Sequence, residues 1–224
     1  MDDIINNNFV IFFLILSSWA LLIVSFSSYW YKEESHFLTS NSQVIKYYRF
    51  DQMRTEYWNY SVFESAVIIP MRDILSYGSQ LSIYRASLSL VILGWIALTA
   101  TLVLLFLNIF EYMSDFRFAV PLIRTVILLA LGFSSASCLT FIGIGSALEE
   151  DCQATNNLEY ARCSHDDRGV FLQHYVFDDT RYHFEEDVER AHGPAYAWYT
   201  AVASSSCLLV ASILSFALPA LAIE

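Results

Sequence analysis

The chain has 224 residues, of which 56% are hydrophobic and 16% are charged. This composition is typical of a membrane protein and excludes an ordinary soluble domain, in which about a quarter of the residues are charged. The formal net charge is −11 at pH 7, and with this acidic balance we expect no nucleic-acid partner.

Four segments are long and apolar enough to cross the hydrocarbon core of a bilayer, which is about 30 Å thick. They are residues 9–26, 88–107, 126–148 and 195–223 of a single membrane domain, 1–224. We expect the first to be a retained span, because residues 1–8 contain no Lys or Arg and no small-residue cleavage site follows it. With four crossings, the long loops at residues 27–87 and 149–194 lie on the same side. We therefore predict an all-α membrane protein built as a four-helix transmembrane bundle.

The first long loop is predicted to form a small antiparallel β-sheet. Residues 36–39 and 44–48 are β-prone and flank a turn at residues 40–43. Residues 56–63 are a further β-prone run, rich in aromatic side chains. A short helix is expected from Met71 onward.

Two tryptophans of this loop, Trp30 and Trp58, are candidates for partner binding. Trp is a favoured anchor at protein interfaces, but it is also an ordinary member of a small sheet that lies on a membrane, and both interpretations remain open. The loop also contains the sequon Asn59-Tyr60-Ser61, which makes Asn59 a glycosylation candidate.

The third predicted span is rich in small residues, which let helices approach closely in a bilayer. We expect it to be the central helix of the bundle and to pack through Gly132 and Ala136, which have small-xxx-small spacing. Gly94 in the second span and Ala203 in the fourth are expected at further helix contacts.

The segment Gly132-Phe133-Ser134-Ser135-Ala136 also matches the G-x-S-x-[GA] pattern of rhomboid-type intramembrane serine proteases. A catalytic serine needs a base within hydrogen-bond reach, and the spans contain no histidine, lysine or carboxylate except at their ends. We therefore interpret these serines as packing residues and expect no enzymatic activity and no cofactor.

The second long loop is acidic, with twelve Asp or Glu against four Arg between residues 149 and 193. We predict that it faces a basic surface on a partner, because complementary charge steers association. The candidate residues are Asp178, Asp179, Glu185, Glu186 and Asp187. Residues 184–190 have helical composition and are expected to extend the fourth span outward.

A metal site is the alternative interpretation of the same loop. His183, Glu186, Glu189 and His192 recur at every third position, so they would lie along one face of a helix. Carboxylates and imidazoles can hold a divalent cation, with His183, Glu186 and His192 as the candidate ligands. They match no established metal-site spacing, and we predict no metal.

The four cysteines divide between loop and spans. Cys138 and Cys207 fall in predicted spans and are expected to be thiols, whereas Cys152 and Cys163 lie in the second loop. We predict a disulfide between Cys152 and Cys163, which would stabilise the fold by about 3 kcal/mol in the chain-entropy model. The alternative is a redox pair, but such pairs use C-x-x-C spacing. A disulfide and a sequon together favour the extracytoplasmic side for both long loops.

The topology resembles that of the claudin and peripheral-myelin-protein-22 superfamily of four-span proteins. Trp30, Trp58 and Arg85 are similar to the W…LW…R elements of the claudin first loop, and Gly193-Pro194 followed by Trp198 resembles the opening of the claudin fourth span. The Gly-Leu-Trp triplet and the two first-loop cysteines of that family are absent. The resemblance implies a four-span fold and a role in contacts with neighbouring membrane proteins.

Three functional hypotheses follow. The first is a non-enzymatic four-span membrane protein that acts through lateral and outer-face contacts with other membrane proteins or further copies of itself. It would be a junction or adhesion component, or an accessory subunit, in the plasma membrane or secretory pathway. The second is a supernumerary subunit of an organellar complex, such as one in the mitochondrial inner membrane. The third is an intramembrane enzyme.

Overall fold

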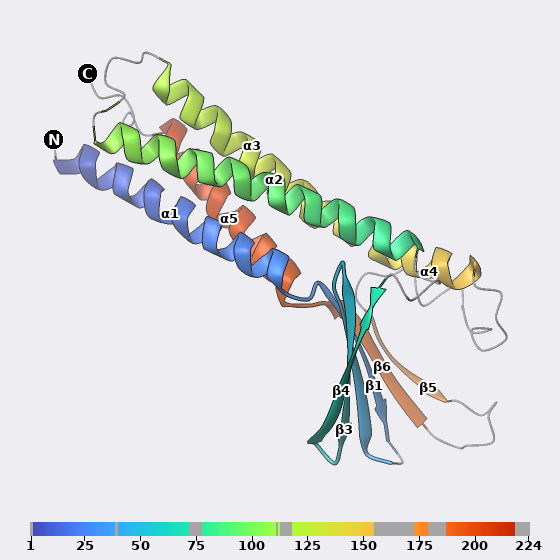
Figure 1. The fold of residues 1–224 in the computed structure, drawn as a ribbon. Coiled ribbons are helices and arrows are strands. Elements are labelled where there is room, and N and C mark those ends of the chain that lie inside the picture. The colour runs from blue at the N-terminus through green and yellow to red at the C-terminus, as the bar shows by residue number, and fades with distance from the viewer. Residues whose placement is uncertain are drawn as a thin grey trace. The chain divides into compact units, whose positions relative to one another are not determined.

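The computed structural model describes residues 2–38, 40–71, 78–110, 112, 118–154, 173–178 and 187–217. Its helices are α1 (Asp2–Ser27), α2 (Gly78–Ile109), α3 (Ala119–Ile142), α4 (Ile144–Ala154) and α5 (Tyr196–Ala217). Its strands are β1 (Tyr31–Phe37), β2 (Ser42–Tyr48), β3 (Gln52–Asn59), β4 (Val62–Pro70), β5 (Gln173–Asp178) and β6 (Asp187–Pro194). Figure 1 shows these elements in chain order.

The chain divides into two compact units. The helical unit consists of Met1–Ser27, Ser87–Leu139 and Tyr199–Glu224. The sheet unit consists of Ser28–Ala86 and Thr140–Trp198. Each unit is therefore assembled from segments that are distant in the sequence.

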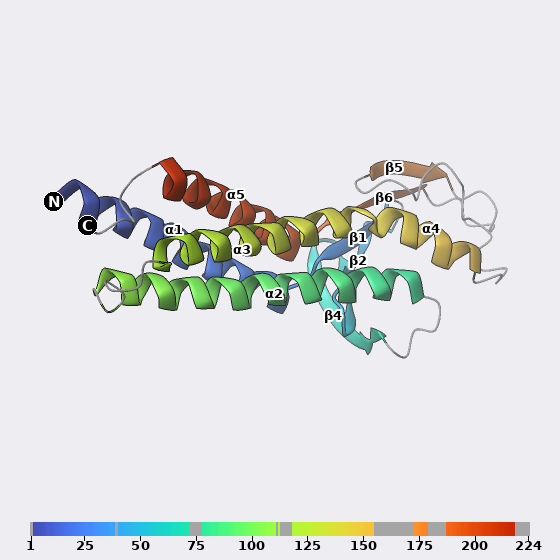
Figure 2. The same ribbon diagram turned by 90° about the horizontal axis from the view of Figure 1, so that it is seen from above.

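The helical unit contains most of α1, α2, α3 and α5, which run side by side in Figures 1 and 2. Each of these four helices is long and apolar enough to cross a membrane, with mean hydropathy between 1.8 and 2.6, as predicted. Only 28–33% of each apolar stretch is buried within the chain. A helix of a protein in water buries an apolar stripe and exposes a polar face. These four helices differ, because large apolar side chains are also among their exposed residues.

The described helices do not coincide fully with the predicted spans, and α1 already begins at Asp2 rather than at residue 9. Helix α2 begins at Gly78 rather than at residue 88, and α3 begins at Ala119 rather than at residue 126. Pro121 lies in the first turn of α3, where a missing backbone N–H costs nothing. The helix then ends at Ile142, before residue 148, because Gly143 forms a tighter turn in which its N–H donates to the carbonyl of Thr140 (3.2 Å).

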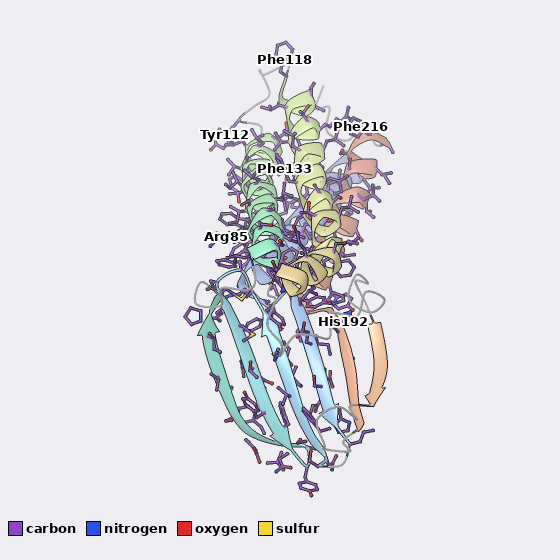
Figure 3. All side chains as sticks on the ribbon, turned by 90° about the vertical axis from the view of Figure 1, so that its right-hand side faces the viewer. Arg85, Tyr112, Phe118, Phe133, His192 and Phe216 are labelled. Carbon is purple, nitrogen blue, oxygen red and sulfur yellow. The ribbon has the colours of Figure 1, made fainter. Side chains whose placement is uncertain are left out.

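The sheet unit contains one six-stranded antiparallel sheet in the order β4-β3-β2-β1-β6-β5. Figure 3 shows the strands of this sheet side by side. The prediction of a sheet in the first long loop is correct but incomplete, since β5 and β6 come from the second loop. The helix predicted at residues 184–190 is wrong, because β6 occupies Asp187–Pro194 and pairs with β1 from Tyr31↔Pro194 to Phe37↔Val188. Pairing with β1 outweighs the weak intrinsic helix preference of this stretch.

Two hairpins organise the first four strands. The predicted hairpin is present, but its turn comes earlier than residues 40–43, since β1 ends at Phe37 and β2 already begins at Ser42. The predicted run 56–63 is two strands, because Tyr60 and Ser61 form a two-residue turn between β3 and β4. Both turn residues have positive φ, 47° and 63°, as in the type I′ turns that match the twist of paired strands. The short helix predicted from Met71 falls largely on residues 72–77, outside the described residues.

Helix α4 is tied to the start of α2 within the sheet unit. The carboxylate of Asp151 accepts hydrogen bonds from the backbone N–H groups of Ser79 (2.8 Å) and Gln80 (2.9 Å), and Asp151 is buried. The first turn of a helix has unpaired N–H donors and a partial positive charge. Asp151 therefore stabilises the start of α2 from a distant part of the chain.

Candidate functional site

Strand β4 is the most exposed strand whose side chains the structure describes. It forms one margin of the sheet, and eight of its nine residues are exposed, with Ile69 half-buried. Its large apolar side chains are accessible to an unusual degree: Val62 is 64%, Val67 46% and Ile68 57% exposed. Exposed apolar residues on an open strand edge form a template for pairing with another chain. We call the stretch 65–69 the open edge.

The direction of the backbone groups along the open edge follows from one hydrogen bond. Met71 donates its N–H to the carbonyl of Asp51 (2.9 Å), and Gln52 pairs with Pro70 in register. Antiparallel pairs alternate between hydrogen-bonded and non-hydrogen-bonded positions. The N–H and C=O groups of residues 65, 67 and 69 thus point toward β3, and those of Ala66 and Ile68 point away from it.

Both ends of the open edge carry features that interrupt strand pairing. At one end the register with β3 shifts between Tyr57 and Trp58, so that Glu64 is an extra residue in β4. At the other end Pro70 lacks an N–H and occupies a position whose nitrogen faces away from β3. The open edge between them has neither a charge nor a proline.

The hairpin tip beside the open edge contains Trp58, one of the predicted partner-binding residues. Trp58 is half-buried and packs edge to face on Phe63, with ring centroids 5.4 Å apart. Its indole N–H donates to Glu56 Oε2 (3.3 Å), and Glu56 Oε1 forms an ion pair with Arg54 Nη2 (2.6 Å). Asn59, the glycosylation candidate, is half-buried at the end of β3 just before the turn.

Burial and nearby carboxylates raise the pKa of a tyrosine on strand β2. Tyr47 on β2 has a raised pKa because it is partly desolvated and because Glu56 and Glu34 add negative charge nearby. Arg49 has a raised pKa mainly because its side chain is hydrogen-bonded to Asp51 (2.6 Å from Nε to Oδ1). Strands β2 and β3 and the turn between them therefore carry interacting charged groups, in contrast to the open edge.

Trp30, the other aromatic candidate for partner binding, is a core residue. It is 3% exposed and packs against Phe141, with ring centroids 4.9 Å apart. Phe141 is fully buried and also contacts Tyr84 (5.5 Å) and Tyr31 (6.3 Å). Of the two interpretations left open for Trp30, its burial favours the structural one, because this aromatic cluster encloses the side chain. Phe141 had no distinguishing sequence signal, since it lay in an apolar run expected to be a membrane span.

The acidic candidates lie at or beyond the edge of the described residues. Asp178 ends β5 and Asp187 begins β6, and their backbones pair with each other. Asp179, Glu185, Glu186 and His183 lie outside the described residues, as does Cys163, so the predicted disulfide of Cys152 and the acidic partner surface stay predictions. Cys138 is buried, Cys207 is half-buried, and the two are not bonded to each other.

No group of His, Cys, Asp or Glu suited to a metal ion occurs among the residues that the structure describes. Of the three metal candidates, only His192 is described. It lies in β6 (Figure 3). Its ring packs against that of Tyr31, with centroids 6.1 Å apart.

Serine hydrogen bonds join neighbouring helices in the helical unit. Ser134 is fully buried, and its hydroxyl bonds that of Ser205 on α5 (2.7 Å). Ser18 and Ser204 each donate to the other's backbone carbonyl (2.8 and 3.1 Å), which joins α1 to α5. These contacts support the interpretation of the serines as packing residues.

The predicted small-residue contacts divide into two groups. Gly94 is buried, and a Cβ there would meet Leu22 Cδ1 at 3.5 Å and Phe133 Cβ at 3.6 Å, so its packing role is confirmed. Gly132 is exposed, and a Cβ there would meet no atom within 4 Å. Ala203 is also exposed and Ala136 is half-buried. The assignment of Gly132 and Ala203 to contacts within this chain is therefore wrong, because small residues occur on outer helix faces as well as inner ones.

Comparison of the sequence with models of known protein families finds no match, and a search of characterised proteins finds no relative.

Proposed function

We propose that this chain is a non-enzymatic four-span membrane protein that acts through contacts with other membrane proteins. It would be a junction or adhesion component, or an accessory subunit of a membrane complex, in the plasma membrane or the secretory pathway. Lateral contacts would come from the helices and further contacts from the sheet unit.

The membrane part of the proposal rests on the surface of the helical unit. Each helix exposes large apolar side chains, such as Phe13, Val103, Leu139 and Ile213. Water would not tolerate so continuous an apolar surface, whereas lipid chains or other membrane helices would cover it. Four crossings put the two strand-forming regions on the same side of the bilayer.

The contact part of the proposal rests on one observation, the open edge of β4. Edge strands of soluble sheets are normally protected from pairing with another chain by a charged side chain, a proline or a bulge within the strand. Here the bulge and the proline stand at the two ends, and five residues between them remain unblocked. An extended segment of a partner could add to this edge through backbone hydrogen bonds. The acidic residues at 178–187 would add charge complementarity, which sets specificity and association rate.

The test is a lysine substitution on the open edge. Ile68→Lys introduces a charge that natural edge strands use to prevent pairing, and it leaves the bonds between β3 and β4 in place. Complexes extracted in mild detergent would be separated by native electrophoresis, and their protein composition quantified by mass spectrometry. We expect the amount of protein recovered with the Ile68→Lys chain to fall at least about ten-fold. This is the effect expected when pairing is prevented and a few backbone hydrogen bonds of about 1 kcal/mol each are not formed.

Tyr57→Lys is the matched control, since Tyr57 is an exposed apolar side chain on β3, one strand away from the edge. This variant should keep its associated chains. A wild-type chain that is monomeric in native membranes, with no associated protein, would contradict the proposed function.

A further inference from the structure

The open edge is symmetric about its central residue. Glu64, the extra residue of the bulge, lies three positions before Val67, and Pro70 lies three positions after it. The outward-facing backbone groups belong to Ala66 and Ile68, one position on either side of Val67. A two-fold axis through Val67 would therefore superpose hydrogen-bonding positions on hydrogen-bonding positions.

An antiparallel copy of β4 fits this edge in a definite register. Ala66 of one copy pairs with Ile68 of the other, and each pair exchanges two backbone hydrogen bonds. Val67 meets the same residue of the second copy on the axis. Glu64 then lies opposite Pro70, so the position without an N–H faces the bulge, where no ladder bond is required. An isologous contact of this kind uses the same surface on both partners.

The charge distribution also permits contact between two copies at this strand. With a net charge of −11, most surfaces of two copies repel each other. The open edge contains no ionisable side chain. In this register the two Glu64 residues are six positions apart, roughly 20 Å at 3.3 Å per residue, which exceeds the screening length of about 8 Å at physiological salt.

We infer that β4 pairs with β4 of a second copy of this chain, antiparallel and centred on Val67, and that the two sheets join into one across the dimer. This inference rests on the proposed function and specifies its partner as the chain itself.

Cysteine cross-linking in native membranes tests the register. Val67→Cys places two thiols at a non-hydrogen-bonded pair, where the Cα atoms are about 4.5 Å apart and a disulfide can close. Val62→Cys is the control, because Val62 is on the same strand and more exposed than Val67 but lies away from the axis. The unsubstituted chain measures cross-linking by the native cysteines.

Under mild oxidation we expect Val67→Cys to give at least about five-fold more disulfide-linked dimer than Val62→Cys, because only the axial pair has disulfide geometry. Equal yields from the two variants would mean that collisions, not pairing, bring the strands together, and would overturn the inference.

A proline substitution supplies an independent test of the backbone bonds. Ile68→Pro removes an N–H that points to the open edge, whereas Val67→Pro removes one that bonds β3. Added to Val67→Cys, Ile68→Pro should abolish the cross-link while the chain keeps its circular-dichroism spectrum. Persistence of the cross-link would overturn the pairing.

The outcome also separates this inference from the proposed function. If Val67→Cys forms no dimer, yet a different membrane protein is lost on Ile68→Lys substitution, self-pairing fails and the proposed function stands. If Val67→Cys forms no dimer and is shielded from a water-soluble maleimide, the strand lies against lipid and self-pairing fails as well.

Discussion

The helical unit and the sheet unit both expose apolar side chains, but the exposure has a different meaning in each. Ile96 on α2 is 53% exposed, among neighbours that are also apolar and exposed. Ile68 on β4 is 57% exposed, but the neighbouring strand β3 carries the ion pair of Arg54 with Glu56. An apolar patch marks a contact site only against a polar background. The comparison therefore points to β4 and not to any one helix.

The contacts within the helical unit also differ from those within the sheet unit. In the helical unit, small polar side chains hydrogen-bond between helices, Gly94 allows a close approach, and Trp95 on α2 packs against Trp19 of α1, with ring centroids 5.9 Å apart. In the sheet unit a fully buried aromatic ring, Phe141, contacts three other rings. Aromatic packing therefore contributes to both units, whereas hydrogen bonds between serines of neighbouring helices are a feature of the helical unit.

The largest expected effect comes from removing the centre of the aromatic cluster. Phe141→Ala should destabilise the sheet unit by about 3–5 kcal/mol, because it deletes a fully buried ring and leaves a cavity. Near-ultraviolet circular dichroism during thermal denaturation would detect the loss of aromatic packing. Phe106→Ala is the control, since Phe106 is half-exposed in the helical unit. Equal shifts for the two variants would remove the distinction between the units.

A smaller effect is expected from leucine at the helix contact. Gly94→Leu should cost about 1–3 kcal/mol by overpacking, because a side chain there runs into Leu22 and Phe133. Gly132→Leu should change stability little, since it meets open space. Melting temperatures in the same detergent compare the two. A Gly132→Leu variant as unstable as Gly94→Leu would show that α3 packs through its Gly132 face after all.

A third variant removes the cap that joins α4 to α2. Asp151→Ala leaves two backbone N–H groups without their acceptor and should destabilise the sheet unit by about 1–2 kcal/mol. Asp151→Asn keeps one acceptor oxygen and should cost less. Hydrogen exchange of the Ser79 and Gln80 amides reports directly on the cap. Unchanged protection in Asp151→Ala would contradict it.

The smallest expected effect is a pH dependence at Tyr47. Its folded pKa lies above the ordinary value near 10, so folding favours the protonated phenol. This stabilisation is fully present below pH 10 and is lost as the pH rises through the folded pKa. Ultraviolet titration should show that Tyr47 ionises late, and Glu56→Gln should lower the pKa of Tyr47 by removing a nearby negative charge. An unaltered titration in Glu56→Gln would contradict this cause.

The existence of four apolar helices and of a sheet in the first loop could be predicted from the sequence. Length and apolar composition alone identify a helix that can cross a bilayer, and alternation with turn residues identifies the hairpin of β1 and β2, to within two residues of its turn. Both signals are local, and neither depends on what the segment contacts. The same local reasoning confirmed Gly94 but misplaced Gly132 and Ala203, since composition does not say which face of an apolar helix turns inward.

Tertiary structure decided the features on which the functional argument depends. Strand β6 forms where helical composition was expected because β1 offers it a paired edge, and Trp30 becomes a core residue because Phe141 closes over it from a distant segment. The open edge of β4 is likewise defined by what lies on each side of the strand: β3 on one side and, among the described strands, none on the other. Strand order is set by pairing between remote segments, so a sequence predicts strands more readily than it predicts which strand will be left at the margin.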